Sequence, residues 1–479
     1  MRAAAARLVA RAHSVSATFP GHFCPYATAV DRGLEQGPRL HRGFSSRQKN
    51  IPEGCRHTPW SLSGFSKTYS SDGSGNDTLS FLPTTTKAVV FDRHGHPGNV
   101  LYVEPKLQLP PIGPDDVLVK WKVSPVNPSD INTVQGVYPI LPKTFPAIGG
   151  SEGVGEILRF GSDVDETSLA GSSLYYYGDD GDDGGNVNSE ETRSKNIRVI
   201  PDVPGLGTWR EFAVVPARSL RIIPSHIPDD TAAQLCVNLP TALRLLEDFV
   251  DLKNNSSSVA INAPTSAVGR AVVQMCKAFD VPVVCSLRAR DTEELWIRDA
   301  ERLKQLGACY VVLDDLKRGG FRTREARDFL KTLPPVRLAL NCVGGDSSLI
   351  LSGVLTENGV IVTYGGMGLS PVYIPTGASI FININAKGFW LTRWNQRVRD
   401  NEARKKMYFD KSEQSEEILP DGIFSGNGDD ECPRDAMYRS LFRMIGRGEL
   451  VMAIARKVGF EDFVQAIDQG KGKTALWMT

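Results

Sequence analysis

Hydrophobic and polar residues alternate along two early stretches of the chain, Lys87 to Phe91 and Asp116 to Val123. A half-buried strand turns apolar side chains to one face and polar side chains to the other, so this alternation predicts antiparallel strands. Short strands of this kind, separated by Gly and Pro turns, are expected as far as about Pro224. The first half of the folded chain is therefore predicted to be a small β-rich barrel.

The pattern changes from about Leu235 onward, where buried apolar runs alternate with helical stretches. A strand at Ser258 to Asn262 precedes a helix from Val268 to Phe279 and a strand from Val281 to Ser286. This alternation predicts a parallel, doubly wound sheet, in which ligands bind at the carboxyl ends of the strands. Further strands are expected at Tyr310 to Leu313, Leu338 to Val343 and Gly359 to Tyr364.

The N-terminus has a different composition from the rest of the chain. Arg2, Arg7 and Arg11 lie among Ala, Val and Ser, and no acidic residue occurs before Asp31. This is typical of a mitochondrial transit peptide, which we place at residues 1–40, with another organelle signal or a disordered tail as alternatives. Residues 41–86 are rich in Ser, Gly, Asn and Pro and are predicted to be a disordered linker.

Composition excludes several classes of function. The 479 residues are 41% hydrophobic and have a formal net charge of zero, which fits a multidomain enzyme and gives no support for binding nucleic acid. No apolar run approaches the roughly 20 residues that span a bilayer. Eight scattered cysteines include no C-x-x-C pair. Two segments, 177–195 and 397–435, are interpreted as surface insertions, and the acidic one is more typical of a solvated loop than of a cation site.

A tight turn follows the strand that ends at Asn262. Its sequence, from Ala263 to Val268, leads into an apolar helix, and Gly269 is expected to allow close packing there. The backbone N–H groups and the dipole of such a helix start stabilise a pyrophosphate. Ala263 and Ala267 stand where glycines are common, so the turn alone fits an ordinary helix cap equally well.

The next strand ends at Ser286 and is followed by Arg288 and Arg290. An NAD-specific site would have an Asp or Glu here to accept hydrogen bonds from the ribose hydroxyls. Guanidinium groups instead match a phosphate dianion, so the two arginines favour the 2'-phosphate of NADPH. The alternative is a solvated basic turn. A glycine turn at Tyr364, Gly365, Gly366 and Met367 ends a later strand, where the nicotinamide half is expected.

Several longer motifs resemble one family. From about Lys87 to Met478 the chain resembles the mitochondrial trans-2-enoyl-CoA reductases of the medium-chain dehydrogenase/reductase superfamily. The resemblance implies an α/β protein with a GroES-like catalytic domain at 87–236 and 393–479 and a Rossmann cofactor domain at 237–392. The motifs that support it are Pro125 to Asn132, Gln135 to Tyr138, Gly149 to Val154, Gly205 to Arg210, Leu338 to Gly345 and Gly388 to Leu391.

Ser151 marks a departure from the zinc alcohol dehydrogenases of that superfamily. Those enzymes have Gly-His-Glu where this chain has Gly150, Ser151 and Glu152, so we expect no catalytic metal. Without a metal, the substrate must be an activated alkene, in which a thioester delocalises the charge after hydride addition. The resemblance makes Tyr138 the catalytic tyrosine, whose phenol can donate a proton at neutral pH.

The resemblance also assigns contacts with NADPH. They comprise the turns described above, Asn238, an aromatic segment and a lysine near the C-terminus. Pro264 and Leu243 depart from the family pattern, as does Ala267. The full predicted set is Asn238, Thr265, Ser266, Ala267, Val268, Arg288, Arg290, Tyr364, Gly365, Gly366, Met367, Phe389, Trp390, Leu391, Thr392 and Lys473.

Two other functions compete with this interpretation. A quinone or enone reductase of the same fold also uses NADPH without zinc, and a catalytically idle relative would act as a binding protein. Tyr138 in its motif argues against the first, and Tyr138 with Arg288 argues against the second. The resemblance further implies an enoyl thioester substrate, an acyl-carrier protein as delivery partner, a homodimer and a place in the mitochondrial matrix.

Overall fold

The computed structural model describes residues 82–164, 169–170, 197–252, 256–412, 432–468 and 473–478. All of them belong to one unit, residues 79–479. Four predicted segments lie wholly or partly outside the described residues. They are the transit peptide, residues 41–81 of the linker, the acidic insertion 177–195 and residues 413–431 of the second insertion.

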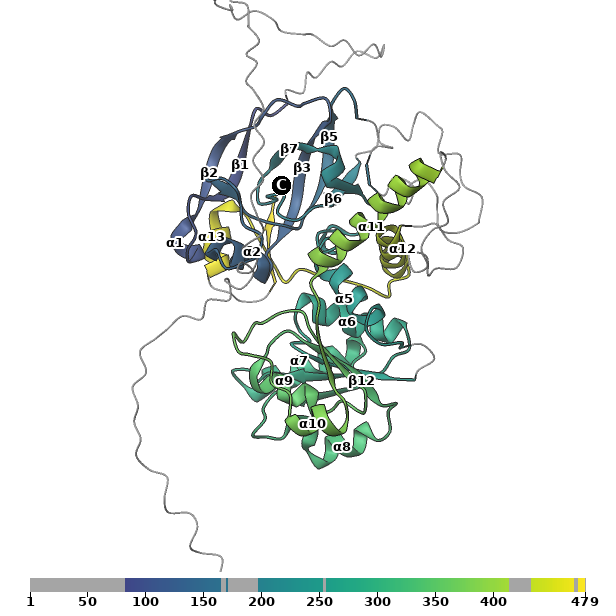
Figure 1. Ribbon diagram of the computed structural model, residues 1–479. Coiled ribbons are helices and arrows are strands. Elements are labelled where there is room, and N and C mark those ends of the chain that lie inside the picture. Colours follow the sequence, from purple (N-terminus) through teal and green to yellow (C-terminus); the bar gives the residue numbers. More distant parts are fainter. Residues whose placement is uncertain are drawn as a thin grey trace, which may run out of the picture. The chain divides into compact units, whose positions relative to one another are not determined.

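The first described strands form a β-rich part with two sheets (Figure 1). One has the order β2-β1-β4, and the other has the order β15-β16-β3-β5-β6-β8, with β7 also paired to β3. Alternate residues of β3, such as Val117, Val119 and Trp121, are fully buried in one core with Trp209, as the alternation predicted. The strands are β1 (Thr85–Phe91), β2 (Leu101–Gln108), β3 (Asp116–Pro125), β4 (Ala147–Ile148), β5 (Val154–Phe160), β6 (Arg198–Pro201), β7 (Phe212–Pro216), β8 (Leu220–Ile222), β15 (Arg456–Val458) and β16 (Thr474–Trp477).

The C-terminal strand returns to this β-rich part. Ala475 of β16 pairs with Pro125 at the end of β3, in antiparallel register. Lys473 directly precedes β16, so the pairing brings it next to the segment that follows β3. A residue near the end of the chain thus reaches the region of Asn127.

The second half forms a six-stranded sheet in which all five pairs of neighbouring strands are parallel. Its order, β11-β10-β9-β12-β13-β14, is that of a Rossmann sheet, and the strand order reverses between β9 and β12. Val259 and Ile261 of β9 face one core while Ala260 faces the other, so both faces are buried. The strands are β9 (Ser258–Asn262), β10 (Val283–Leu287), β11 (Tyr310–Leu313), β12 (Val336–Asn341), β13 (Val360–Thr363) and β14 (Asn385–Gly388).

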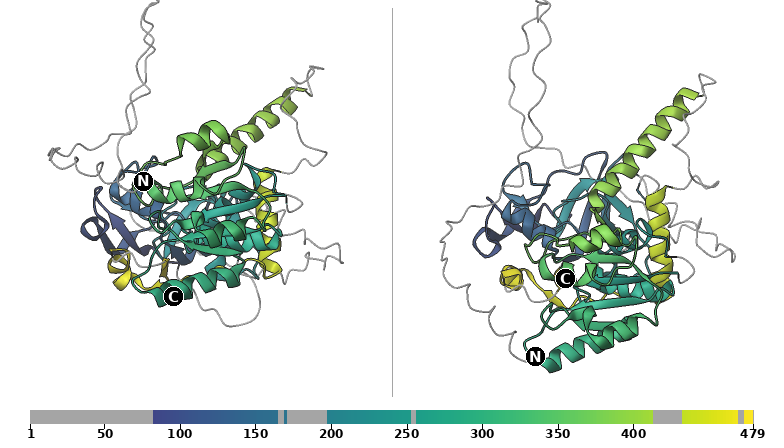
Figure 2. Two further views of the ribbon diagram at one scale, coloured as in Figure 1. Left: turned by 90° about the horizontal axis from the view of Figure 1, so that it is seen from below. Right: turned by 60° about the horizontal axis from the view of Figure 1, so that its bottom comes forward.

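The first part of the second insertion is helical. Residues 397–412 continue helix α11, the long green helix of Figures 1 and 2. No described helix is long and apolar enough to cross a membrane. The helices are α1 (Pro97–Val100), α2 (Pro128–Gln135), α4 (Asp229–Ala232), α5 (Asn238–Glu247), α6 (Ala267–Ala278), α7 (Glu293–Leu306), α8 (Arg324–Leu330), α9 (Gly345–Ser352), α10 (Thr376–Phe381), α11 (Leu391–Ser412), α12 (Pro433–Gly446) and α13 (Phe460–Asp468).

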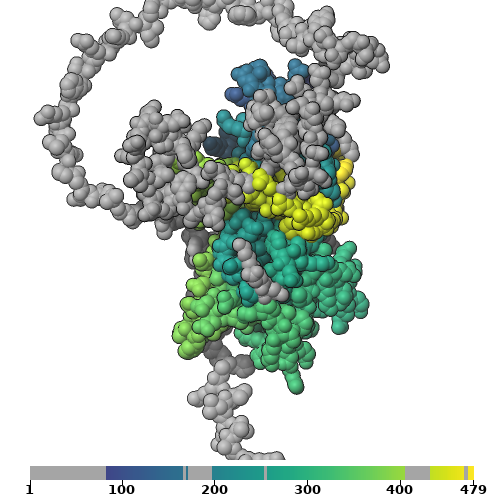
Figure 3. Space-filling model, turned by 90° about the vertical axis from the view of Figure 1, so that its right-hand side faces the viewer, coloured from purple at the N-terminus to yellow at the C-terminus, as the bar shows by residue number. Residues whose placement is uncertain are grey.

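Helix α12 connects the two halves. Its Leu441 is fully buried in the same core as Leu243 of α5 and Val259 of β9, and yellow C-terminal residues lie against teal residues in Figure 3. Its first turn carries Arg434, which donates to the buried Asp202 after β6 at 2.6 Å. Apolar burial and a buried ion pair therefore hold α12, and with it the end of the second insertion, against both halves.

Candidate active site

The turn after β9 has the geometry of a phosphate-binding turn. Ala263 has a φ of +46°, a left-handed conformation that costs a non-glycine residue about 1–2 kcal/mol. The Ser266 side chain caps α6 by accepting a hydrogen bond from the Gly269 N–H at 3.1 Å. A Cβ added to Gly269 would lie 2.6 Å from the Ala263 carbonyl oxygen, so only glycine fits there. Thr265 is exposed at the tip of the turn, and Ala267 is buried.

The two arginines after β10 differ in their surroundings. The Arg290 Nε lies 2.7 Å from Asp299 of α7, and another of its guanidinium nitrogens donates to the Thr265 hydroxyl at 3.2 Å. Arg288 is exposed, and its side chain has no ion-pair partner among the residues that the structure describes. Arg290 thus links the turns after β9 and β10, whereas Arg288 remains available to an anion.

Buried polar side chains fix the carboxyl ends of the central strands. The Asn262 amide nitrogen donates to Asn341 at 2.8 Å and to the Ser347 hydroxyl at 3.0 Å. Asp314 accepts hydrogen bonds from Ser347 at 2.7 Å and from Ser286 at 2.9 Å. These bonds join β9, β10, β12 and the turn after β11, which holds the edge where a dinucleotide would bind.

The glycine turn after β13 leaves room for a ligand. The Met367 N–H donates to the Cys342 carbonyl at 2.8 Å, which fixes the turn, while a Cβ on Gly366 would meet nothing within 4 Å. The Tyr364 hydroxyl is buried, with the side chains of Cys342 and Ser266 as its polar neighbours. Burial raises the pKa of this phenol well above its ordinary value, with the neighbouring Cys342 adding to the shift. The open side of Gly366 leaves room for a bound polar group.

Tyr138 lies just beyond α2, which ends at Gly136 in a left-handed conformation with a φ of +79°. Trp390 Nε1 donates to the Tyr138 hydroxyl at 2.9 Å, and the two rings meet edge to face with centroids 6.1 Å apart. Burial raises the pKa of Tyr138, and the charge of Asp130 adds to the shift, while Trp390 and Thr392 oppose it. The oxygen of this neutral phenol accepts from Trp390, so its own proton can be donated to a substrate.

A second group of polar residues is buried behind the tyrosine. The Glu152 side chain is fully buried, and one of its oxygens accepts from the backbone N–H groups of Val237 at 2.6 Å and Asn238 at 3.1 Å. The other accepts from the side-chain amides of Asn127 at 2.7 Å and Asn238 at 2.6 Å. Lys473 Nζ donates to Asn127 Oδ1 at 2.5 Å and lies 4.0 Å from Glu152. We call Asn127, Glu152, Asn238 and Lys473 the inner cluster.

Charge in the inner cluster is set by burial and pairing. Burial raises the pKa of Glu152 and lowers that of Lys473, and the attraction between the two groups opposes both shifts. The nearby Asp130 accepts a hydrogen bond from Ser151 at 2.7 Å, yet burial raises its pKa to about 6. Ser151 stands where the zinc-dependent enzymes of the superfamily have a histidine ligand, and here its hydroxyl donates a hydrogen bond to Asp130 instead.

Known proteins match about two thirds of the chain in sequence. Residues 113–225 match the model of the alcohol dehydrogenase GroES-like domain. The mitochondrial enoyl-[acyl-carrier-protein] reductase of Caenorhabditis elegans is 37% identical over 324 residues, which cover 68% of this chain and 83% of that protein. The human protein of the same name is 39% identical over 315 residues, covering 66% and 74%. The chain belongs to this reductase family.

Solved structures agree with the family. The mitochondrial 2-enoyl thioester reductase Etr1p/Etr2p heterodimer of Candida tropicalis has a TM-score of 0.63 and 26% identity, over 82% of this chain and all of that chain. A complex of Etr1p with NADP and crotonyl-CoA has the same TM-score and 27% identity, with the same coverage. The predicted fold, a GroES-like part with a Rossmann sheet, is confirmed.

The structure brings many of the predicted reductase residues together. Tyr138 meets Trp390 and Thr392 of the Phe389-Trp390-Leu391-Thr392 segment, and Asn238 meets Lys473 through Asn127. Thr265 meets Arg290, whereas Arg288 stands apart. No group of three or more His, Cys, Asp or Glu side chains within the described residues is placed to bind a metal.

Sequence reasoning assigned no role to three residues that the structure places at the site. Asn127 and Glu152 lie within motifs that support the family resemblance, so the sequence marks their positions but does not indicate their contacts. Asp299 occupies an ordinary helical position and was missed completely. A buried carboxylate can be recognised only from the donors around it, and those donors come from distant parts of the chain.

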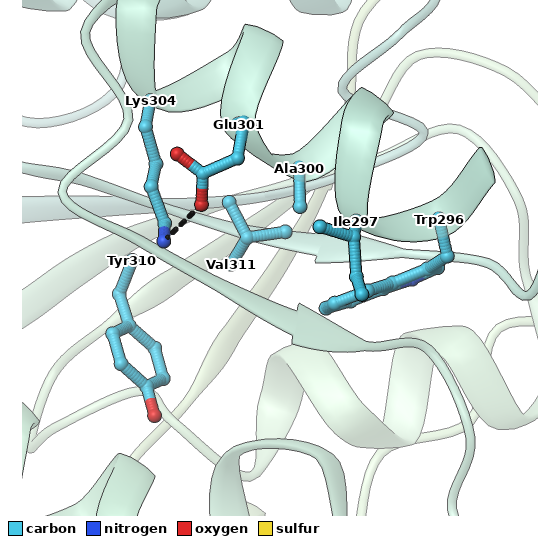
Figure 4. Close-up of a pocket in the computed structure, with 7 residues that line it drawn as sticks. All are labelled: Trp296, Ile297, Ala300, Glu301, Lys304, Tyr310 and Val311. Atoms are coloured by element: carbon cyan, nitrogen blue, oxygen red, sulfur yellow. Dashed lines mark hydrogen bonds and ion pairs between the residues drawn. The ribbon is translucent and has the colours of Figure 1, made fainter. Parts of the chain in front are cut away.

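Two pockets lie among the elements of the Rossmann half and helix α11. One, of about 450 Å³, adjoins the tyrosine through Trp390. The other, of about 220 Å³, lies between α7 and β11, and its ionic residues Glu301 and Lys304 pair with each other at 2.8 Å (Figure 4). We call the first the α11 pocket, and the residues of its wall used below are Asp248, Phe249, Phe389, Trp390, Arg393, Trp394 and Arg397.

Proposed function

We propose that the chain reduces the 2,3 double bond of trans-2-enoyl thioesters to give saturated acyl thioesters, with NADPH as the reductant. The relatives that show the family are mitochondrial enoyl-[acyl-carrier-protein] reductases. We place the reaction of this chain in mitochondrial fatty acid synthesis. The predicted transit peptide lies outside the described residues. The observation that supports this function most is the Tyr138 hydroxyl, which is neutral, half-buried and oriented by Trp390.

The residues divide the reaction between them. Bound NADPH supplies the hydride that adds to the β carbon, and the thioester takes the resulting charge as an enolate. Tyr138 gives its proton to the α carbon, and Trp390 stabilises the phenolate that remains by its N–H donor. Solvent returns the proton to Tyr138 after the product leaves. The tyrosine must therefore be neutral before each turnover, as a phenol is at neutral pH, and burial raises its pKa further.

NADPH fits the residues along the edge of the Rossmann sheet. The helix start at Ser266 would hold the pyrophosphate, and Arg288 would pair with the 2'-phosphate. The open side of Gly366 favours a polar group over the glycine turn. Asn238 and Lys473 of the inner cluster would contact the nicotinamide half.

A homodimer joined through the Rossmann sheets is part of the proposal. Strand β14 is the edge of its sheet, and all four of its residues are exposed. Phe381 of α10, four residues before β14, is 82% exposed, and Leu369, in the loop after β13, is 95% exposed. An unpaired edge with apolar neighbours favours pairing with a second copy. An acyl-carrier protein is the proposed delivery partner, as the name of the relatives suggests.

One assay tests the function. NADPH oxidation by the full chain is followed with trans-2-hexenoyl-CoA, with NADH and a quinone measured in parallel. We expect rapid oxidation with the thioester, little with NADH, and a rate 10²–10⁴-fold lower for Tyr138→Phe, since this range is typical of losing a general acid. Activity with the quinone alone, unaffected by the substitution, would leave only the fold and the cofactor.

A further inference from the structure

We propose that the α11 pocket binds the phosphopantetheine arm of the thioester substrate, with Arg393 and Arg397 pairing with its phosphate. This arm is shared by CoA and by carrier proteins, so the pocket would accept both. The inference rests on the proposed function, because it names the part of the thioester that the enzyme holds.

The position of the pocket suits this ligand. Trp390 lines its wall, and the Nε1 of the same side chain donates to the Tyr138 hydroxyl at 2.9 Å. A long arm in the pocket would therefore direct its thioester end toward Tyr138. The volume of about 450 Å³ lies within the usual range for small-molecule sites.

The walls combine aromatic rings with polar groups. Phe249 and Phe389 meet edge to face, with centroids 6.0 Å apart, and Trp394 adds a third ring on α11. Flat aromatic faces pack well against the two amide planes and the geminal methyl groups of pantetheine. An acyl chain alone would require no charged residue at this wall.

Charge at the pocket is unbalanced. Asp248 is paired with Arg244, so its carboxylate is already neutralised. Arg393 and Arg397 are exposed and have no ion-pair partner within the described part of the chain. They lie four residues apart on α11, where like charges destabilise a helix, and Arg393 lies in its first turn, where the helix dipole disfavours a cation.

A phosphate group would remove this cost. Guanidinium groups bind phosphate oxygens in a bidentate manner, and two of them one helical turn apart can share one anion. Pantetheine ends in a phosphate in both ligands, as a phosphodiester to serine in a carrier protein and as part of a diphosphate in CoA. The pocket thus places an anion site at one end and the catalytic tyrosine at the other.

The test compares ligands with and without the phosphate. Binding of hexanoyl-CoA and of hexanoyl pantetheine to the full chain is measured by calorimetry, which requires no turnover. The Arg393→Gln/Arg397→Gln variant should bind hexanoyl-CoA on the order of 10- to 100-fold more weakly, as expected for losing charged hydrogen bonds. Its affinity for hexanoyl pantetheine should change far less. Arg404→Gln, at an exposed α11 position outside the pocket wall, is the matched control and should keep the CoA preference.

The single Arg397→Gln variant is measured as well, because it leaves Arg393 in place. The Arg393 guanidinium lies 5.9 Å from the centre of the Trp390 ring, so removing Arg393 can disturb that ring. Thermal unfolding checks each variant. Equal losses for both ligands, or no loss with CoA, would overturn the proposal. So would an effect on hexenoyl-CoA turnover that is absent with the hexenoyl carrier protein, since the arginines would then contact the nucleotide.

The two proposals fail in different ways. If the wild type prefers hexanoyl-CoA over hexanoyl pantetheine, and loss of the arginines weakens the binding of hexanoyl-CoA and of the hexanoyl carrier protein alike, the pocket assignment holds even without NADPH oxidation, and only the proposed reaction fails. If hexenoyl-CoA is reduced rapidly and the variants keep the full preference for the phosphate, the reaction stands and the pocket assignment is wrong.

Discussion

The inner cluster and the arginine turn after β10 use charge in opposite ways. Glu152 is fully buried and the Lys473 side chain is only 11% exposed, and both are hydrogen-bonded to the Asn127 side chain before any ligand arrives. Arg288 is exposed, and only its neighbour Arg290 is held, by Asp299. The inner cluster is therefore oriented by the fold, whereas Arg288 would be oriented by the ligand. Because solvent screens exposed charges, changes in the inner cluster should have the larger effects.

Glu152→Gln should have the largest effect on stability. The carboxylate accepts four hydrogen bonds, so a glutamine NH2 group would face two donors whichever way it turns. The substitution also leaves Lys473 without its buried counter-charge. We expect the two effects together to lower the free energy of unfolding by about 3–5 kcal/mol. Urea unfolding measures this.

Glu301→Gln is the matched control, because Glu301 pairs with Lys304 at the surface. Its removal should change the free energy of unfolding by about 0.5 kcal/mol or less. Equal effects of the two substitutions would break the distinction between the fold-oriented cluster and the exposed charges.

Asp130→Asn should alter how stability depends on pH. Burial raises the pKa of Asp130 from 3.8 to about 6, so the folded state binds this proton more tightly than the unfolded state. The stabilisation from the bound proton is complete below pH 3.8 and is lost as the pH rises through 6. Relative to the variant, the wild type should lose up to about 3 kcal/mol between pH 4 and pH 7. Urea unfolding at several pH values gives the two curves, and parallel curves would contradict the burial of this carboxyl.

The sequence predicted the two halves better than the contacts between them. Local patterns indicated the strand that ends at Asn262 and the helix that begins near Val268, because periodicity and capping act over a few residues. Pro282 has no N–H for a ladder, and β10 begins after it, two residues later than predicted.

The inner cluster could not be predicted from such patterns. Lys473 and Asn127 are 346 positions apart, and they meet because β16 pairs with the end of β3. The family resemblance named Asn238 and Lys473, but not the carboxylate between them. Nothing in the local sequence of Glu152 distinguishes a buried acceptor of four hydrogen bonds from a surface acid.

Arg288→Gln should weaken the choice of cofactor. If Arg288 pairs with the 2'-phosphate, its removal should lower the preference for NADPH over NADH by on the order of 10- to 100-fold, measured as the ratio of kcat/KM values. Arg290→Gln is the comparison, because Arg290 is already paired with Asp299 and should affect this ratio less. A larger effect of Arg290→Gln would mean that the fold, rather than the ligand, orients the phosphate-binding guanidinium.

Trp390→Phe should give the smallest effect and the most specific one. Phenylalanine keeps an aromatic ring but removes the N–H that donates to the Tyr138 hydroxyl at 2.9 Å. A single hydrogen bond contributes about 1 kcal/mol, so kcat should fall roughly fivefold. The bond lowers the pKa of Tyr138, so its loss raises that pKa further, and the phenol stays neutral throughout the neutral range. The rate should therefore fall equally at pH 6 and pH 8. Trp394→Phe, in the same pocket wall, is the control and should not slow proton transfer. A loss of kcat in Trp390→Phe as large as in Tyr138→Phe would show that the indole ring itself, and not its N–H group, positions the tyrosine.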